Sequence, residues 1–319
     1  MTLEVIYIMA LNIALIRSLT SQPGYTLMRG PARFNWVRSL VTGIKRALGR
    51  TEATRMEIKL KAEMGETLFT GLDVEKYMAN LHQRGSSFGL KLPEYLVQEI
   101  IHYAESNPVY AFRDPKLGFM PPDRHKAETV LGKKIPLAQY FNLQLNCPAI
   151  NKIALDPVIN WIALNYIGCV PRYLGANLWW TYPTIAERSE RLKHAQFFHR
   201  DIDDFKFLKF FFYLTDVEAG DGGHWIVIDS HRNPPHVRLK DRFVTRRFED
   251  EEINNYYENS KLIEVIGQAG TGFSEDTLCV HKAATPARNP RLILQLQFGL
   301  FDFVPDNDYR ITSELQRVC

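Results

Sequence analysis

Residues 197–217, FFHRDIDDFKFLKFFFYLTDV, place a histidine and three aspartates directly before a very apolar run. The run from Phe207 to Leu214 has the composition of a strand that buries a core. Such strands do not usually begin with so many ionisable groups, so the opening is either a solvated turn or a binding site. If it is extended, His199 and Asp201 point to the same face, because side chains two apart in a strand do so.

The second half of the chain contains several short runs rich in aromatic and β-branched residues. Clusters of Gly, Asp, Asn and Pro, such as EAGDGG and SHRNPP, separate these runs. Strands with turn signals and no long helices between them predict an antiparallel sandwich or jelly roll. The predicted strands lie at 177–183, 205–217, 224–230, 261–267, 277–282 and 291–303.

The first half is predicted to be mainly helical and to pack on one face of that sheet. Apolar residues at helical spacing predict helices at 34–48, 73–85, 92–108 and 149–166, the last one interrupted or entered at Pro157. The proline-rich and charged residues 109–135 predict a long loop. We expect an N-terminal helical extension at 1–50 and one domain at 51–319, with a helical part at about 51–170 and a core at about 171–305.

The composition is that of an ordinary globular protein. The chain has 319 residues, of which 45% are hydrophobic and 24% are charged, and a formal net charge of +3. So small a charge does not predict a nucleic-acid partner. The four scattered cysteines form no CxxC pair, which favours reduced thiols and a cytoplasmic location. The sequence does not indicate an oligomeric state.

An apolar run lies near the N-terminus, at 3–18 (LEVIYIMALNIALIRS). Its uninterrupted part is shorter than the roughly 20 residues that span a bilayer, and no basic residues precede it. We therefore expect no transmembrane segment. A helix that covers the core is the first interpretation, and a helix on a membrane surface or a partner is the alternative.

A possible third ligand and an unusual arginine lie far downstream, in TLCVHKAATPARNPR (277–291). His281 ends a short apolar strand, and Arg291 opens the next one. A buried guanidinium requires an anion to offset its desolvation, so Arg291 predicts a carboxylate partner. Two neutral imidazoles and one carboxylate leave three positions of an octahedral ion open, as suits non-haem Fe(II) oxygenases.

Taken together, these motifs resemble the phytanoyl-CoA dioxygenase-like family of Fe(II)/2-oxoglutarate oxygenases. The resemblance rests on FFHRDIDDFKFLKFFFYLTDV, GDGGHWIVIDSHR, the AGTGF turn and HKAATPARNPR, in this order, and covers about two-fifths of the chain (175–303). It implies a double-stranded β-helix (a cupin-like jelly roll) flanked by helices. It also implies that His199, Asp201 and His281 hold iron, and that Arg291 binds the distal carboxylate of 2-oxoglutarate.

The resemblance implies a dioxygenase that uses Fe(II), 2-oxoglutarate and O₂. We expect it to hydroxylate an aliphatic C–H bond of a small-molecule substrate and to release succinate and CO₂, with no catalytic residue beyond the metal triad. Asp201 is present where related halogenases carry a small residue, so halogenation is not favoured. A desaturase, an epimerase, a ring-forming oxidase and a non-catalytic jelly-roll binding module remain alternatives.

The remaining polar residues near the motifs have less specific expectations. Thr181, Lys209 and Phe211 either contact the cosubstrate or pack in the core. Asp203 and Asp204 are expected to cap the turn or to pair with Lys206 or Arg200. The residues expected at the surface, at the pocket rim or in an exposed turn are His194, His224, His231 and His236. Arg288, which lies in the loop before Pro290, is the weaker candidate for the role of Arg291.

Overall fold

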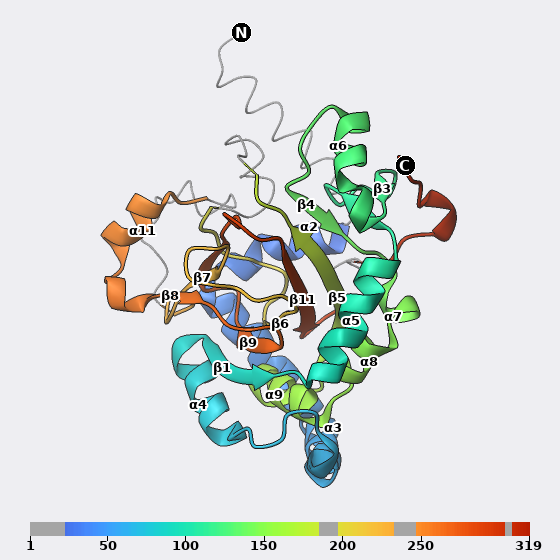
Figure 1. The fold of residues 1–319 in the computed structure, drawn as a ribbon. Helices are drawn as coiled ribbons and strands as arrows, with labels where there is room; N and C mark the ends of the chain where they lie inside the picture. Colours follow the sequence, from blue (N-terminus) through green and yellow to red (C-terminus); the bar gives the residue numbers. More distant parts are fainter. Residues whose placement is uncertain (1–22, 185–196, 233–246, 304–307) are drawn as a thin grey trace.

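The fold is built on two antiparallel sheets, in a computed structural model that describes residues 23–184, 197–232, 247–303 and 308–319 (Figure 1). The larger sheet has eight strands in the order β1-β9-β6-β11-β5-β4-β2-β3. Their bounds are β1 Ser86–Lys91, β2 Val109–Ala111, β3 Gly118–Phe119, β4 Leu137–Gln139, β5 Arg172–Thr181, β6 Phe207–Tyr213, β9 Thr271–Glu275 and β11 Arg291–Gly299. Long antiparallel pairings of β11 with β5 and with β6 form its centre.

The smaller sheet has the order β10-β7-β8, with β7 at His224–Val227, β8 at Leu262–Val265 and β10 at Val280–Ala283. An antiparallel bridge between His199 and His281 joins the segment around His199 to β10, at the edge of the smaller sheet. From β5 to β11 the chain therefore passes back and forth between the two sheets. This arrangement is the predicted double-stranded β-helix, and the predicted fold class is confirmed.

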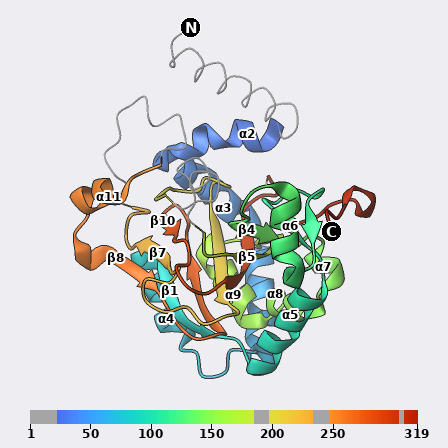
Figure 2. The same cartoon turned by 45° about the horizontal axis from the view of Figure 1, so that its top comes forward.

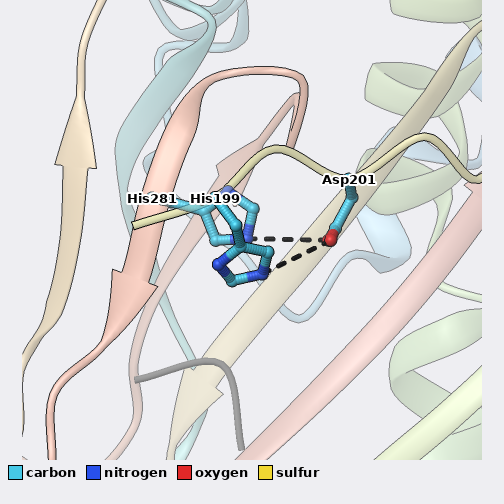
Figure 3. A group of neighbouring side chains, drawn as sticks. All are labelled: His199, Asp201 and His281. Carbon is cyan, nitrogen blue, oxygen red and sulfur yellow. Dashed lines mark ion pairs between the residues drawn. The ribbon is translucent and has the colours of Figure 1, made fainter. Parts of the chain in front are cut away.

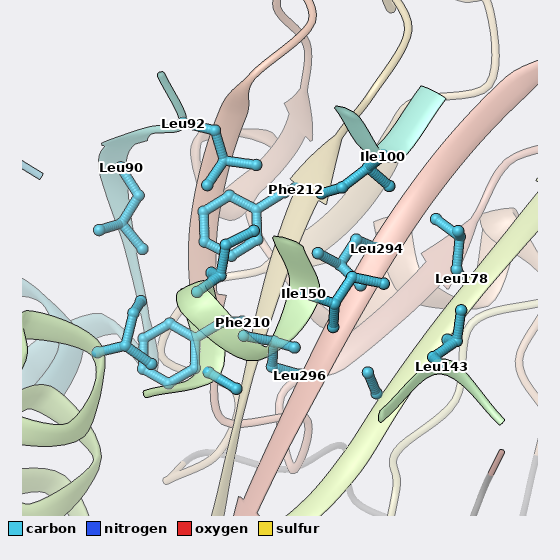
Figure 4. Close-up of a cluster of buried hydrophobic side chains, with 14 of the residues drawn as sticks. Leu90, Leu92, Ile100, Leu143, Ile150, Leu178, Phe210, Phe212, Leu294 and Leu296 are labelled. Atoms are coloured by element: carbon cyan, nitrogen blue, oxygen red, sulfur yellow. The ribbon is translucent and has the colours of Figure 1, made fainter. Parts of the chain in front are cut away.

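Helices cover the outer face of the larger sheet and enclose the main core (Figure 4). Phe210, Phe212, Leu294 and Leu296 project from β6 and β11 toward Ile150 and other helical side chains. Helix α9 is apolar except for two asparagines, as suits a helix that lies between the sheet and other helices. The helices are α2 Pro23–Arg29, α3 Asn35–Glu63, α4 Val74–Arg84, α5 Glu94–Ser106, α6 Arg124–Leu131, α7 Leu143–Asn146, α8 Pro148–Ala154, α9 Pro157–Ile167 and α11 Asp250–Tyr256.

A second apolar cluster fills the space between the two sheets. Phe211 and Tyr213 of β6 contribute to it together with Phe273, Ile226 and Val265. Strand β6 is buried on both faces, and its odd-numbered side chains face the smaller sheet. Lys209, another odd-numbered residue of this strand, contacts Asp201.

Several elements differ from the sequence-based expectations. The predicted loop at 109–135 contains β2, β3 and α6, whose shortness hides them from periodicity. The glycine-rich AGTGF stretch enters β9. The helix predicted at 34–48 is α3, which has 29 residues and runs across residue 50. The apolar run at 3–18 lies outside the described residues. None of the described helices is long and apolar enough to cross a membrane.

In Figure 2, helix α2 runs across one end of the molecule, and α4, α5 and α9 lie toward the opposite end. From α2, the side chain of Tyr25 donates a hydrogen bond to Asp203, in the segment before β6.

Candidate metal centre

The structure brings His199, Asp201 and His281 together at the edge of the smaller sheet (Figure 3). The backbones of the two histidines exchange hydrogen bonds, from His199 N to His281 O and from His281 N to His199 O, each 2.9 Å long. Asp201 N donates to Thr277 O at 2.8 Å. These bonds place residues separated by about 80 positions side by side.

The three side chains present their ligand atoms to one another. These atoms lie within 4.8 Å of each other. His199 Nε2 is 3.4 Å from Asp201 Oδ1, and His281 Nε2 is 3.6 Å from Asp201 Oδ2. In both rings Nδ1 is 2.9 Å from a backbone carbonyl, that of Phe197 or of Cys279. A proton on Nδ1 leaves the Nε2 lone pair free for a metal, so the donor set fits a divalent transition metal.

Asp201 is held as a carboxylate by its neighbours. Burial would raise the pKa of Asp201, but Lys209, followed by His281 and His199, outweighs burial and holds that pKa well below its usual range. Lys209 Nζ is 2.7 Å from Asp201 Oδ2 and 2.8 Å from Asp203 Oδ2. Burial lowers the pKa of His281 to about 4, which keeps this imidazole in the neutral form that a metal requires.

Asp203 links the centre to other parts of the chain. Tyr25 of α2 donates to Asp203 Oδ1 at 2.9 Å, and Gln297 Nε2 lies 3.3 Å from Asp203 Oδ2. Asp203 therefore pairs with Lys209, and not with Lys206 or Arg200 as the local sequence suggested. Residues from α2, β6 and β11 meet at this one carboxylate.

Asp204 caps the turn before β6, as expected. It is fully buried and accepts hydrogen bonds from Phe205 N and Phe301 N, each at 2.6 Å. Burial raises the pKa of Asp204 to about 7. The side chain caps the turn before β6 and ties this turn to the end of β11.

His224 and Glu275 form a buried pair behind His281. His224 Nε2 is 2.8 Å from Glu275 Oε2, and the His224 ring stacks on His281 with centroids 5.5 Å apart. Burial lowers the pKa of His224 to about 3 and raises that of Glu275 to about 8. The expectation of a surface or rim position for His224 was wrong, although its place after GDGG at the start of β7 could have suggested a role. Glu275 carried no local signal.

Arg291 is 2% exposed and opens β11 opposite Thr181 of β5. Its guanidinium donates to Gly222 O and lies 3.4 Å from Thr181 Oγ1. Its Nε has no partner, and no described carboxylate forms an ion pair with the side chain. Burial lowers the pKa of Arg291. This incompletely bonded cation fits a bound carboxylate, which the sequence analysis expected it to require.

The other candidates occupy different environments. Phe211 stacks on Phe273 and contacts His224, so it lines the space behind the ligands. Arg288 is exposed and pairs with Glu218. His231 is partly buried, with Nδ1 3.6 Å from Cys279 Sγ, so the expected exposed turn was wrong. His194 and His236 lie outside the described residues.

The comparisons with known proteins show a similarity in fold alone. The sequence matches no protein-family model and no curated protein. Among solved structures, the chain is similar to the epimerase SnoN in complex with Fe³⁺, alpha ketoglutarate and nogalamycin RO, with 16% identity over 70% of this chain and 82% of that one and a TM-score of 0.49. HygX from Streptomyces hygroscopicus, with nickel and 2-oxoglutarate bound, is 14% identical over 70% and 86%, with a TM-score of 0.47. AviO1 from Streptomyces viridochromogenes Tue57 is 12% identical over 72% and 96%, with a TM-score of 0.46.

Proposed function

We propose that this protein is an Fe(II)- and 2-oxoglutarate-dependent dioxygenase of the phytanoyl-CoA dioxygenase-like family. The observation that carries the proposal is the meeting of His199, Asp201 and His281, with both Nε2 atoms and the carboxylate directed at one point. Two imidazoles and one carboxylate suit Fe(II) and leave three positions for other ligands. A carbohydrate-binding or partner-binding jelly roll would not require this set.

Each residue has a defined part in the proposal. His199 and His281 would bind iron through Nε2, and Asp201 through one oxygen, while Lys209 holds the other oxygen. Arg291 would bind the distal carboxylate of 2-oxoglutarate, since its Nε lacks a partner and carboxylates suit the guanidinium. Thr181, beside Arg291, would donate its hydroxyl to the same carboxylate.

The iron with 2-oxoglutarate would supply the oxidation of a substrate C–H bond by O₂, coupled to the release of succinate and CO₂. The protein would supply binding, orientation and a dry site. Phe211, Phe273 and Ile293 belong to the apolar cluster between the sheets, which excludes water from the inner side of the centre. Among the outcomes open to such a centre, we propose hydroxylation of an aliphatic C–H bond. Asp201 would occupy the position that a halide would need, which places hydroxylation and other oxidations ahead of halogenation.

The proposal extends to organisation and location. We propose one oxygenase domain over 51–319 after an N-terminal extension, with α3 continuing from the extension into the domain, and a cytoplasmic location. The cysteines support this location, since all four are free thiols and three are buried.

Metal binding and cosubstrate turnover test the function. We expect the full-length protein to bind Fe(II) anaerobically and, in air, to convert 2-oxoglutarate to succinate slowly even without substrate. Asp201→Ala and His281→Ala are expected to lose Fe(II) binding while retaining their circular dichroism spectra. Normal iron content in both variants would refute the ligand assignment, and the absence of iron-dependent succinate in the wild type would refute the reaction.

Arg291 is tested separately. Arg291→Gln should leave Fe(II) affinity nearly unchanged and weaken 2-oxoglutarate binding by about tenfold or more, the scale of a lost charge-assisted hydrogen bond. Anaerobic titration of the metal-free protein with Fe(II) measures the metal affinity, and isothermal titration calorimetry on the Ni(II)-loaded protein measures the 2-oxoglutarate affinity. Arg288→Gln removes the same charge from an exposed site and serves as the control. Equal 2-oxoglutarate affinity in the two variants would exclude Arg291 from the cosubstrate site.

A further inference from the structure

The first half of helix α3 has an exposed apolar side. Four large apolar side chains in this half are 52–81% exposed: Trp36, Leu40, Ile44 and Leu48. They are spaced four residues apart, and residues at this spacing are neighbours on the surface of a helix. Gly43 and Ala47 are also exposed, and the helical period places them on the same side. These six residues form one apolar surface, the α3 face, which is about 18 Å long at the rise of a helix.

The opposite side of α3 anchors the helix to the rest of the molecule. Val41, Ala53 and Met56 pack against the main core, and α3 lies against α9. Arg46 Nε donates a hydrogen bond to Ile167 O at 3.2 Å, at the end of α9. The helix is therefore held through its inner side, and its position does not depend on contacts made by the α3 face.

The second half of the same helix has the pattern of a helix in water. Lys61 pairs with Glu57 at 2.9 Å, and Lys59 pairs with Glu63 at 3.7 Å, each across four residues. Ile58 is exposed there as well, but it lies between these charged residues. Helices at a protein surface normally carry polar residues on their exposed side. The α3 face departs from this pattern, and contiguous apolar patches of this kind mark interaction sites.

The charge around the α3 face indicates the kind of partner. No Asp or Glu occurs between Glu4 and Glu52, whereas this stretch contains seven basic residues: Arg17, Arg29, Arg33, Arg38, Lys45, Arg46 and Arg50. The formal charge of the stretch, +7, exceeds the +3 of the whole chain, so the positive charge is concentrated here. A second copy of this chain would bring the same charge to the contact, and repulsion would oppose the pairing. An anionic surface would be attracted.

We propose that the α3 face docks this protein on an anionic lipid bilayer, with the helix lying in the plane of the interface. The four large side chains would enter the boundary between headgroups and acyl chains, and the neighbouring basic residues would contact the anionic headgroups. Trp36 suits this boundary, because its ring is apolar and carries a polar N–H group. The inference is independent of the proposed function, since no residue of the candidate metal centre takes part.

Vesicle binding by the full-length protein tests the proposal. Flotation compares vesicles of equal parts phosphatidylcholine and phosphatidylserine with vesicles of phosphatidylcholine alone. We expect strong binding to the mixed vesicles, much weaker binding to the neutral ones, and a decrease with added salt, which screens the attraction. Ile44→Glu places a charge within the apolar surface, and Arg50→Glu reverses a charge at its end. Each should weaken binding to the mixed vesicles by about tenfold or more.

Matched controls make the same changes elsewhere. Leu155 and Arg172 are exposed and lie outside α3, so Leu155→Glu and Arg172→Glu should bind vesicles as the wild type does. Circular dichroism establishes that each variant is folded.

Trp36 also provides a direct probe of insertion. Trp161 and Trp179 are buried, and Trp180 and Trp225 are half-buried, whereas Trp36 is exposed. Brominated phosphatidylcholine in the mixed vesicles should therefore quench mainly the fluorescence of Trp36. Trp36→Phe should still bind, but with most of this quenching lost. Quenching that is unchanged in Trp36→Phe would contradict insertion of the α3 face.

Other outcomes would overturn the proposal as well. Equal vesicle binding by Ile44→Glu and the wild type would assign the binding to another part of the chain. Equal binding to neutral and anionic vesicles would remove the role of charge. A dimer in sedimentation velocity that Ile44→Glu dissociates would show that a second copy covers the face. No binding of the wild type to either kind of vesicle would leave the apolar run at 3–18 as the favoured cover for the face.

Discussion

Lys209 is the side chain on which two neighbouring carboxylates depend. It is 6% exposed and lies within 2.8 Å of both Asp201 and Asp203. Removing one partner of such a buried group typically costs about 3 kcal/mol or more; Asp201 is 23% exposed, so we expect about 2 kcal/mol. Lys209→Met should therefore lower the free energy of unfolding of the metal-free protein by this amount in urea titrations.

The same variant should respond more strongly to a divalent metal. Without the ammonium group, a bound ion meets less repulsion, and two nearby carboxylates have lost their ammonium partner. Ni(II) should therefore stabilise Lys209→Met more than it stabilises the wild type, whereas Lys209→Arg keeps the charge and should resemble the wild type. An equal response to Ni(II) in Lys209→Met and the wild type would contradict this account of the ion pair.

Asp204 gives the stability a defined pH dependence. Its pKa is about 7 in the folded protein and about 3.9 in an unfolded chain. The folded state therefore binds more protons between these values, and the contribution of Asp204 to stability falls as pH rises from about 4 to about 7. Asp204→Asn cannot titrate. The free energy of unfolding of the wild type, relative to this variant, should be higher at pH 5 than at pH 8 by a few kcal/mol at most; a constant difference would contradict the raised pKa.

At the scale of residues, the sequence identified those candidate site residues that a local pattern or a motif marks. His199 and Asp201 are two apart, and the downstream HKAATPARNPR motif marked His281 and Arg291. It could not predict partners that only the fold brings together. Tyr25 reaches Asp203 across 178 positions, and Glu275 lies behind His281 through the pairing of distant strands. No short spacing encodes contacts of this kind.

At the scale of elements, the prediction succeeded where turn signals bounded a run of apolar residues. The six predicted strands of the second half each overlap an observed strand, and the break at Pro157 separates α8 from α9. It failed for β2 and β3, which have only three and two residues. Strands so short have no measurable period and depend on their neighbours in the sheet for their conformation.

Gly272 of β9 tests how closely the central strands pack. A Cβ atom there would lie 2.4 Å from Phe212 Cδ1 and 3.0 Å from Leu90 Cβ, and neither neighbour is free to move in the core. Gly272→Ala should therefore destabilise the protein by about 1–3 kcal/mol, as overpacking does. Gly43→Ala is the control, since nothing lies within 4 Å of its Cβ position in exposed α3; it should stabilise by up to about 1 kcal/mol. Urea unfolding measures the free energy of unfolding of both variants. An unchanged value for Gly272→Ala would mean that β6 and β1 can move away from β9.

At the scale of the whole molecule, the candidate centre lies where the two sheets meet. Asp201 and His199 come from the segment before β6 of the larger sheet, and His281 from β10 of the smaller one. The main core, between the larger sheet and the helices, is far more extensive than the cluster between the sheets. The smaller sheet is therefore held by fewer apolar contacts, and an ion shared by these ligands would cross-link it to the rest of the molecule.

Metal binding should consequently raise the thermal stability of the whole protein. A ligand that binds only the folded state at 100 times its dissociation constant stabilises by about 2.7 kcal/mol, which corresponds to a rise in Tm of roughly 5 °C for a domain of this size. We expect Ni(II) to produce such a shift in differential scanning calorimetry and a chelator to reverse it. Asp201→Ala should abolish the shift, because two imidazoles alone hold the ion weakly. His125→Ala removes an exposed histidine outside the centre and should keep the full shift, whereas a loss of the shift in this variant would show that surface histidines, and not the proposed triad, bind the metal.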